Sequence, residues 1–220
     1  MITAHSQEPR KVVSVDPQMS DIYNVLNLLD IKMFRFDLTS FLSEKYSVNL
    51  YMDEYKNNQK IKRVRVMNLG ENIKSLDEIP EEHREYFRKS KQVPEGKNEW
   101  NNIKEMSLYI RKKNDSIAIL TIDIPDVMRM NQQMTLYPVS EFKTYFYEAR
   151  PFVYNEMDGK EELNIPLVMY GSGWYDTKYK VVRFCGETKI DTDMKADILS
   201  NIPHHYVVGL ELKKTKKTAK

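Results

Sequence analysis

The sequence has a single cysteine, Cys185, and only seven glycines among its 220 residues. One thiol excludes a disulfide within the chain and a zinc site built from several thiolates. The scarcity of glycine argues against a collagen-like or linker-rich chain. Basic and acidic residues number 34 and 32, and the net charge of +2 gives no field that would favour nucleic acid as a partner. No apolar run reaches the roughly 20 residues that span a bilayer.

The first nine residues, MITAHSQEP, are similar to the end of a secretory signal, because Ala4 and Ser6 form a small-residue cleavage pattern. The basic region and the apolar core of such a signal are missing. We therefore expect a signal-peptide remnant at residues 1–6 of a longer precursor, and a periplasmic or extracellular protein. The alternative is an ordinary N-terminal extension.

The chain does contain enough apolar and aromatic residues to form a core, with 41% hydrophobic residues and 14 tyrosines. Residues 46–70 predict a β-hairpin, because apolar residues alternate with polar ones on both arms. The turn falls at residues 56–59, where Asn57 and Asn58 tolerate left-handed backbone angles. One buried face is expected, formed by Val48, Leu50, Met52, Ile61, Val64 and Val66.

Similar patterns predict further strands at 31–38, 106–111, 116–124, 134–139, 142–155, 161–170, 179–185 and 205–212. The strand at 116–124 has apolar residues on both faces and is expected to be central in its sheet. Asp158-Gly159 is the strongest turn signal. Residues 126–133 show no clear period and predict a linker. Short helices are expected after Ser20-Asp21, with Ile22 and Leu29 on one face, and at 80–89.

So many short strands with turns between them predict an antiparallel β-sandwich, jelly-roll-like, with one or two short helices. It is expected over residues 20–212, after an exposed arm at 1–19 and before a basic tail at 213–220. Two hairpins of similar spacing divide the sandwich into halves at about 31–125 and 134–212. A duplication would explain this, and so would the general likeness of β-hairpins.

No signature of catalysis or metal binding is present. Cys185 follows an apolar stretch, so we expect a buried, inert thiol rather than a nucleophile paired with His204 or His205. The three aspartates of residues 191–197 lack the glycine and the bidentate acid of a calcium loop. Nucleotide-binding, zinc-protease and serine-hydrolase motifs are missing. We predict no catalytic residue, no metal and no cofactor.

An aromatic cluster is the best candidate for a binding site. Tyr170, Trp174, Tyr175 and Tyr179 surround two glycines. Such residues can form a flat platform for a sugar ring or for a partner's side chain. The alternative is that they close one end of the sandwich as part of its core.

Four segments resemble uncharacterised secreted β-rich proteins of Bacteroidetes-type bacteria. They are FRFDL (34–38), the hairpin of residues 54–60, RFCG (183–186) and PHHYVVGLEL (203–212). The resemblance spans most of the chain and implies export and a β-rich fold. It carries no known activity and adds no site residue.

The sequence therefore predicts an exported, non-enzymatic β-sandwich that binds a macromolecule of the cell envelope. A protein partner is the first expectation, and a carbohydrate-binding module that uses the same aromatics is the second. The third is a hydrolase with an unrecognised acid pair, although nothing in the sequence pairs two carboxylates across a sugar. The oligomeric state is not predicted.

Overall fold

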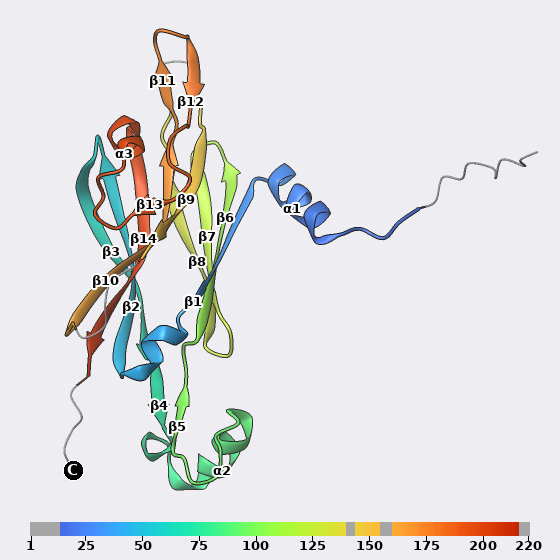
Figure 1. Cartoon of the computed structure of the whole chain (residues 1–220), viewed down its shortest axis with the longest axis vertical. Helices are drawn as coiled ribbons and strands as arrows, with labels where there is room; N and C mark the ends of the chain where they lie inside the picture. Colours follow the sequence, from blue (N-terminus) through green and yellow to red (C-terminus); the bar gives the residue numbers. More distant parts are fainter. Residues whose placement is uncertain (1–13, 140–143, 155–159, 216–220) are drawn as a thin grey trace, which may run out of the picture.

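The computed structural model describes residues 14–139, 144–154 and 160–215, and most of them form two facing β-sheets (Figure 1). The four-stranded sheet has the order β1 (Ile31–Asp37), β6 (Glu105–Asn114), β7 (Ile117–Ile124), β8 (Met128–Thr135). The six-stranded sheet has the order β13 (Ile190–Asp191), β9 (Tyr147–Val153), β10 (Glu162–Ser172), β14 (His204–Lys214), β2 (Tyr46–Lys56), β3 (Gln59–Glu71). Neighbours pair antiparallel except β13 and β9, which are parallel. The predicted, mainly β sandwich is confirmed.

The main core lies between the two sheets. Strands β6 and β7 bury every second residue, among them Leu108 and Ile110 on β6 and Leu120 and Ile122 on β7. The six-stranded sheet contributes residues such as Leu210, which is also fully buried. Removing this apolar layer from water is the dominant favourable term in folding. As expected, β7 lies inside its sheet, between β6 and β8.

The hairpin of β2 and β3 is confirmed, with one difference in burial. Asn57 and Asn58 have φ angles of 48° and 57°, which is the left-handed pair that a two-residue hairpin turn needs. Ile61, expected in the core, is 57% exposed. The register skips it, because Glu54 pairs with Lys62 and the next residue, Tyr55, pairs with Lys60. This bulge turns Ile61 away from the core.

The segment of residues 184–203, for which no element was predicted beyond the end of the strand at 179–185, covers part of the outer face of the six-stranded sheet. Residues 184–203 include β13 and α3 (Asp197–Asn201). Their apolar side chains bury Phe152, Met169 and Val207, which point away from the main core. Strands β10 and β14 are therefore buried on both faces at this end, and β2 is likewise buried on both faces over most of its length. The expectation of one buried face for β2 is wrong.

Three predictions about strands need correction. Residues 128–135 form β8, so the linker expected at 126–133 is wrong and the strand expected at 134–139 ends at Thr135. Met128, Met130 and Met134 face the core at period two, and the polar Gln132 interrupts this pattern in the sequence. The strand expected at 179–185 shrinks to β12 (Val181–Arg183), and its partner β11 (Trp174–Asp176) was not predicted. The predicted turn Asp158-Gly159 lies outside the described residues.

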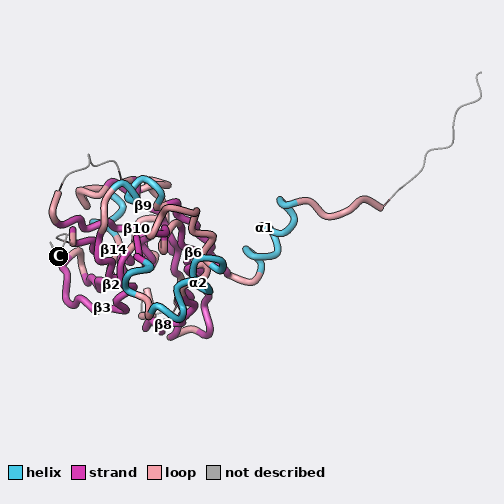
Figure 2. Tube along the Cα trace, turned by 90° about the horizontal axis from the view of Figure 1, so that it is seen from below, coloured by secondary structure: helices cyan, strands magenta, loops and turns pink. Residues whose placement is uncertain are grey.

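Two appendages extend from the sandwich (Figures 1 and 2). Helix α1 (Met19–Leu28) precedes β1 and stands away from both sheets. Its N-cap is Gln18, in a capping box with Asp21, and not the expected Ser20-Asp21. The second appendage, here called the α2 unit, comprises residues 73–101 at the end of the sandwich opposite the β11–β12 hairpin. It contains β4 (Ile73–Ser75), η2 (Leu76–Glu78), the expected helix α2 (Glu81–Ser90) and β5 (Glu99–Asn101).

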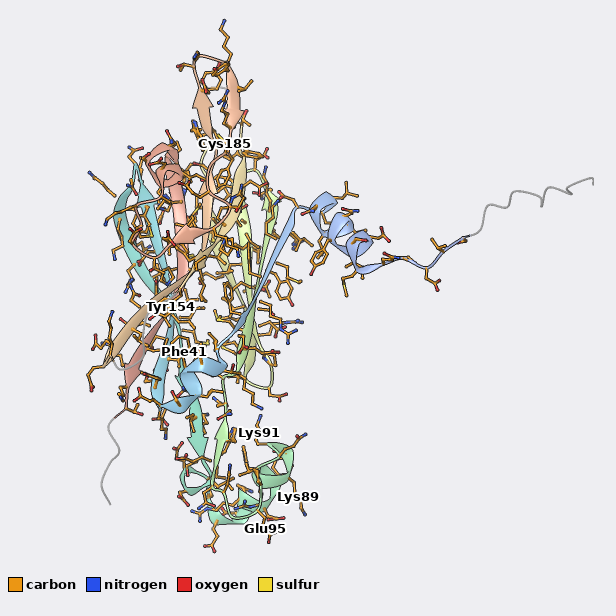
Figure 3. All side chains as sticks on the ribbon, in the orientation of Figure 1. Phe41, Lys89, Lys91, Glu95, Tyr154 and Cys185 are labelled. Carbon is orange, nitrogen blue, oxygen red and sulfur yellow. The ribbon has the colours of Figure 1, made fainter. Side chains whose placement is uncertain are left out.

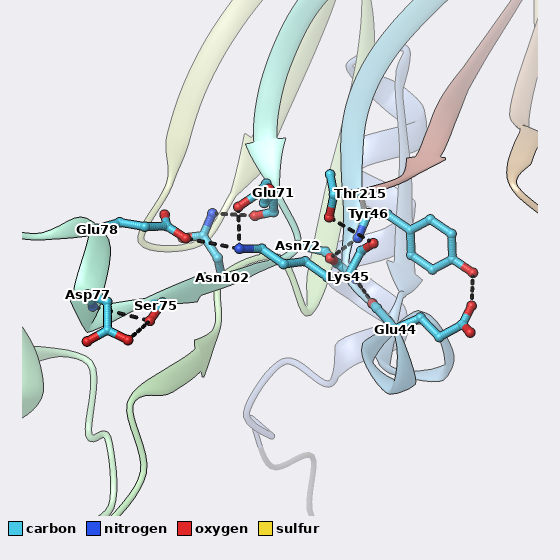
Figure 4. Close-up of polar contacts among 10 residues, drawn as sticks. All are labelled: Glu44, Lys45, Tyr46, Glu71, Asn72, Ser75, Asp77, Glu78, Asn102 and Thr215. Carbon is cyan, nitrogen blue, oxygen red and sulfur yellow. Dashed lines mark hydrogen bonds and ion pairs between the residues drawn. The ribbon is translucent and has the colours of Figure 1, made fainter. Parts of the chain in front are cut away.

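Asn72 joins the α2 unit to the sandwich (Figure 4). Its side-chain oxygen accepts from the backbone N–H of Tyr46 at 2.8 Å, and its amide nitrogen donates to the carbonyls of Phe41 and Glu44. Its own carbonyl accepts from the backbone N–H groups of Asn102 and Ile103. The residue is buried, so these bonds replace all the water that its polar groups would otherwise bind. The 3₁₀ turn η1 (Thr39–Ser43) lies beside this joint.

The two predicted halves are not separate in space. The six-stranded sheet takes β2 and β3 from the first half and its other four strands from the second. Duplication of one unit stays a prediction. Among the described residues, no helix combines the length and the apolar character needed to cross a bilayer.

Candidate functional site

The predicted aromatic cluster falls on and near the β11–β12 hairpin, which projects beyond one end of the sandwich (Figure 1). Gly173 connects β10 to this hairpin. A side chain there would come within 2.8 Å of the Arg183 carbonyl and 2.9 Å of the Phe146 ring. Its N–H also donates to the Phe146 carbonyl at 2.8 Å. Glycine is therefore needed for close packing, and the hairpin is fixed at its base.

At the tip, Tyr179 lies among charged side chains. The Arg183 guanidinium is 4.3 Å from the centre of its ring, and the Lys178 ammonium is 5.0 Å away. Asp176 orders this tip, because its Oδ1 accepts from the backbone N–H groups of Lys178 and Tyr179. Its Oδ2 pairs with Arg183 Nε at 3.1 Å. The tip thus presents a tyrosine held beside cations, with 55% of Tyr179 exposed.

The other predicted residues occupy different environments. Trp174 is partly buried at the base of the hairpin, 6.4 Å from the ring of Phe184. Tyr175 is also partly exposed, and it pairs with Val182 across the hairpin. Tyr170 is 2% exposed and packs against Tyr147 inside the main core. Three of the four residues therefore share the hairpin, and Tyr170 is not at the surface, because β10 points it between the sheets.

Sequence reasoning missed a pocket at the same end of the sandwich. Its volume is about 360 Å³. We call it the His204 pocket, and it is lined by Glu54, Lys56, Asn57, Ile61, Tyr137, Pro138, Ser172, Pro203 and His204. The residues come from β2 and the turn after it, the segment after β8, the end of β10 and the start of β14, so only the sheet pairing brings them together. No spacing along the chain signals such a site.

A chain of hydrogen bonds fixes the ring at the floor of this pocket. The Tyr137 backbone N–H donates to the Tyr147 hydroxyl at 3.0 Å. The Tyr147 hydroxyl hydrogen is then free to donate to His204 Nδ1, 2.9 Å away. In the neutral ring, Nε2 carries the proton and donates to Glu54 Oε1 at 3.0 Å. Both ring nitrogens are used within the protein, so His204 holds the pocket in shape and is not positioned to take a proton from a ligand.

Burial sets the electrostatics of this site. It lowers the pKa of His204, while the hydrogen bond to Glu54 acts in the opposite direction. Burial also raises the pKa of Tyr147 above its ordinary value. The ring is therefore neutral at neutral pH, and the pocket carries the negative charge of Glu54 with the exposed Lys56 nearby.

Residues 1–214 match a family model described as a domain of unknown function, DUF5041. The chain belongs to this DUF5041 family. No curated protein and no solved structure matches it.

Two further sequence predictions for this DUF5041 chain concern Cys185 and the three aspartates of residues 191–197. Cys185 is exposed beside the base of the hairpin (Figure 3), so the expectation of a buried thiol is wrong. The reason is that β12 ends at Arg183, before the cysteine. Among the described residues, no cluster of three or more His, Cys, Asp or Glu side chains could hold a metal, and this includes the aspartates of residues 191–197.

Proposed function

We propose that this chain is an exported, non-enzymatic β-sandwich that binds a protein partner with its hairpin end. The observation that carries the proposal is the set of large apolar side chains exposed there. They are Ile61 (57%), Tyr137 (46%), Phe146 (39%), Tyr179 (55%) and Val181 (45%). Aromatic and apolar anchors beside a charged rim are typical of protein interfaces.

The geometry favours a protein over a sugar at the hairpin. A sugar ring stacks on an open aromatic face. The Tyr179 ring has the guanidinium of Arg183 over it, and Trp174 packs against Phe184. A protein partner can instead use the exposed edge of Tyr179 and the aliphatic side of Val181.

The His204 pocket suits one side chain of the partner. Its walls include the apolar residues Ile61, Pro138 and Pro203, and its floor has the carboxylate of Glu54. A side chain with an apolar stem and a hydrogen-bond donor at its tip fits both features, because a buried polar tip needs a partner. The surrounding apolar groups would exclude water from this contact.

A glycan is the second candidate, and the same pocket favours it. Tyr137 stands at its edge, 4.6 Å from the His204 ring in an edge-on arrangement, and Glu54 offers an acceptor for hydroxyl groups. Such a combination of an aromatic ring and a carboxylate can bind a terminal sugar.

The test compares paired substitutions in the full chain. Tyr179→Ser with Val181→Ser removes the tip anchors, and Ile61→Ser with Tyr137→Ser removes those of the pocket. Tyr86→Ser is the matched control, because Tyr86 is 71% exposed on α2 at the opposite end. Partners captured from cell-envelope extracts are identified, and dissociation constants are measured with the purified partner. Loss of two hot-spot side chains should weaken binding more than about tenfold, with unchanged melting temperature.

Equal binding by wild type and both double variants would contradict the proposal. A rise in melting temperature with one glycan class, without protein capture, would favour the second candidate, since a ligand of the native state stabilises it by mass action. Export is tested by fractionation of the native host, where a protein found only in the cytoplasm would contradict it.

A further inference from the structure

Strand β8 is the last strand of the four-stranded sheet, and one side of its backbone has no neighbouring strand. Backbone hydrogen bonds in an antiparallel pair alternate along each strand. The Leu136 N–H donates to the Ser116 carbonyl at 2.8 Å, and the same register continues along β8 from Thr135 to Met128. The even-numbered residues of β8 therefore bond to β7, and the odd-numbered residues direct their N–H and C=O groups outward.

Two side-chain contacts agree with this alternation. The outward carbonyl of Thr135 accepts from the Tyr206 hydroxyl at 3.0 Å, and that of Gln133 accepts from the side chain of the preceding residue at 3.0 Å. Within the part of the chain that the structure describes, the outward N–H groups of Arg129, Asn131 and Gln133 have no hydrogen-bond partner. These groups form the β8 edge, which has the donors and acceptors that an extended chain would pair with.

The other three outer strands of the two sheets are protected against such pairing. Strand β13 has only two residues. The register of β3 shifts at three places, and the strand carries Lys60 and Lys62. On β1, Lys32 shares the core-facing side with Phe34, and its ammonium reaches Glu148 on β9. Short edge strands, bulges, lysines and inward-pointing charges all prevent edge-to-edge association.

Strand β8 has none of these protections. Its eight residues pair with β7 in an unbroken register, and its sequence contains neither lysine nor proline. Its one charged residue, Arg129, points outward and pairs with Asp123 on β7 at 2.8 Å. A regular strand of this kind, open along one side, is the type of edge that accepts an additional strand.

The facing sheet extends beyond the β8 edge. At one side of the sandwich, β1 lies against β9, where Lys32 bonds to Glu148. At the other side, β8 lies against β14, where Thr135 accepts from Tyr206. Because β2 and β3 follow β14 in the six-stranded sheet, β3 extends past β8. Figure 2 shows β3 and β8 at the same side of the sandwich, with β9 at the opposite side.

A strand added to β8 would therefore lie opposite the inner face of β3. Val64 and Met67 pair with Met52 and Leu50, which are buried in the main core, so they share the inward face. Both β3 residues are only partly buried. Lys62 lies on the same face two residues before Val64 and is exposed. An added strand would thus place apolar side chains on Val64 and Met67, and an acidic one near Lys62 would complement its charge.

A second copy of this chain does not fit the β8 edge. Antiparallel pairing of two β8 strands would relate the copies by a two-fold axis. Each β3 extends past its own β8, so the two β3 strands would meet in the same space. The exposed lysines of both strands would also be brought together. A single extended segment avoids both conflicts.

We propose that β8 binds an extended segment of another protein as an additional antiparallel or parallel strand. The segment alternates apolar residues, which face β3, with polar ones, and it carries an acidic residue for Lys62. Its backbone pairs with the odd-numbered residues of β8. The inference goes beyond the proposed function, because β8 contains none of the anchors at the hairpin end. Either surface can therefore fail its test while the other stands.

Amide hydrogen exchange of the full chain, followed by NMR, tests whether the edge is free. The N–H groups of Arg129, Asn131 and Gln133 should exchange about tenfold or more faster than those of Met130 and Gln132, because only the latter bond to β7. Equal protection of both sets would mean that the edge is already paired, and this would overturn the proposal.

Peptide selection tests the binding. A phage library of random peptides of about twelve residues, enough to span a strand, is panned against the full chain, and a selected peptide is synthesised. It should show the alternating pattern with an acid, and it should slow exchange at Asn131 and Gln133. Gln133→Pro removes an N–H that makes no bond to β7, so the melting temperature should hold. Its dissociation constant for the peptide should rise about tenfold or more.

Met33→Pro is the matched control. Its N–H on β1 also points away from the neighbouring strand, because Leu38 bonds to the Lys104 carbonyl and the register continues to Ile31. This variant should bind the peptide like the wild type. No selected peptide, or equal binding by wild type and Gln133→Pro, would overturn the proposal. Self-association of the wild type that Gln133→Pro abolishes would also overturn it, since the occupant would then be a second copy.

Discussion

At the residue scale, two adjacent histidines show how a strand separates neighbouring side chains. His204 points toward the space between the sheets, where Tyr147 and Glu54 hold it. His205 points to the outer face, under the segment of residues 184–203, where it is fully buried. It stacks on Tyr55 at 4.6 Å, and neither of its ring nitrogens has a hydrogen-bond partner among the described residues. A charged imidazole cannot be accommodated there without water.

We expect stability to fall with acid because of His205. Burial lowers its pKa to about 4, and the neighbouring His204 adds to the shift. The unfolded chain binds this proton at about pH 6.5, so the unfolded state holds more protons between these values and the free energy of unfolding decreases as pH falls. The loss amounts to roughly 3 kcal/mol below pH 4. His205→Phe keeps the stack on Tyr55 and removes the titration.

Chemical denaturation of both proteins from pH 7 to pH 4 measures the effect. The free energy of unfolding should fall more steeply with acid in the wild type than in His205→Phe. The pH dependence that remains in the variant comes from His204 and the carboxylates. The same slope in the two proteins would contradict this prediction.

The residue scale is also where sequence reasoning was least successful. Period two correctly placed residues such as Val48 and Leu50 in the core. It did not place Tyr170, which β10 directs into the core between the sheets, or Cys185, which lies beyond the end of β12 and is exposed. The hydrogen-bond chain of the His204 pocket has no sequence signal either, since Glu54 and His204 are 150 residues apart.

At the element scale, turn chemistry was predictive, whereas hydrophobic alternation failed for one strand. The Asn57-Asn58 turn fixed the β2–β3 hairpin, and Pro80 with two following acids marked the start of α2. Strand β8 was missed because Gln132 occupies an inward position. A polar residue at an inward position therefore hides a strand from a reading based on alternation.

The connection between elements at Asn72 gives the next prediction. Asn72→Ala removes one acceptor and two donors, and it leaves the N–H of Tyr46 and the carbonyls of Phe41 and Glu44 without their partners. Each buried polar group left unpaired costs about 1–3 kcal/mol. We expect a total loss of about 3 kcal/mol or more, which lowers the melting temperature by roughly 10 °C in a domain of this size.

Calorimetry of Asn72→Ala beside Asn68→Ala provides the comparison. Asn68 is exposed, and its side chain accepts a single bond from the Gly70 N–H. The control should therefore lose less than about 1 kcal/mol. Similar losses of stability in the two variants would contradict the conclusion that Asn72 joins the α2 unit to the sandwich.

At the scale of the whole molecule, the described residues form three apolar clusters that share no residue. The main core joins both sheets, a second cluster lies under residues 184–203, and the α2 unit has its own small cluster of Leu76, Val93 and Trp100. Between the sandwich and the α2 unit lies a cleft of about 790 Å³, which Lys91 crosses by donating to the Asp126 carbonyl at 3.3 Å. The sandwich is therefore expected to fold without the α2 unit.

Excision of the α2 unit tests this independence. Ser75 and Glu99 are directly paired, so replacing residues 76–98 by Asn-Gly closes β4 and β5 with a two-residue hairpin turn. Trp100→Thr, added in the same chain, removes a side chain that would otherwise lose its cover. The excised protein should unfold in one cooperative thermal transition, within a few degrees of the wild type, because the ion pair of Lys45 with Glu78 is exposed and worth at most about 1 kcal/mol. Loss of cooperative unfolding would mean that the α2 unit is needed to close this end of the sandwich. The main core and the cluster of the α2 unit would then form one cooperative unit.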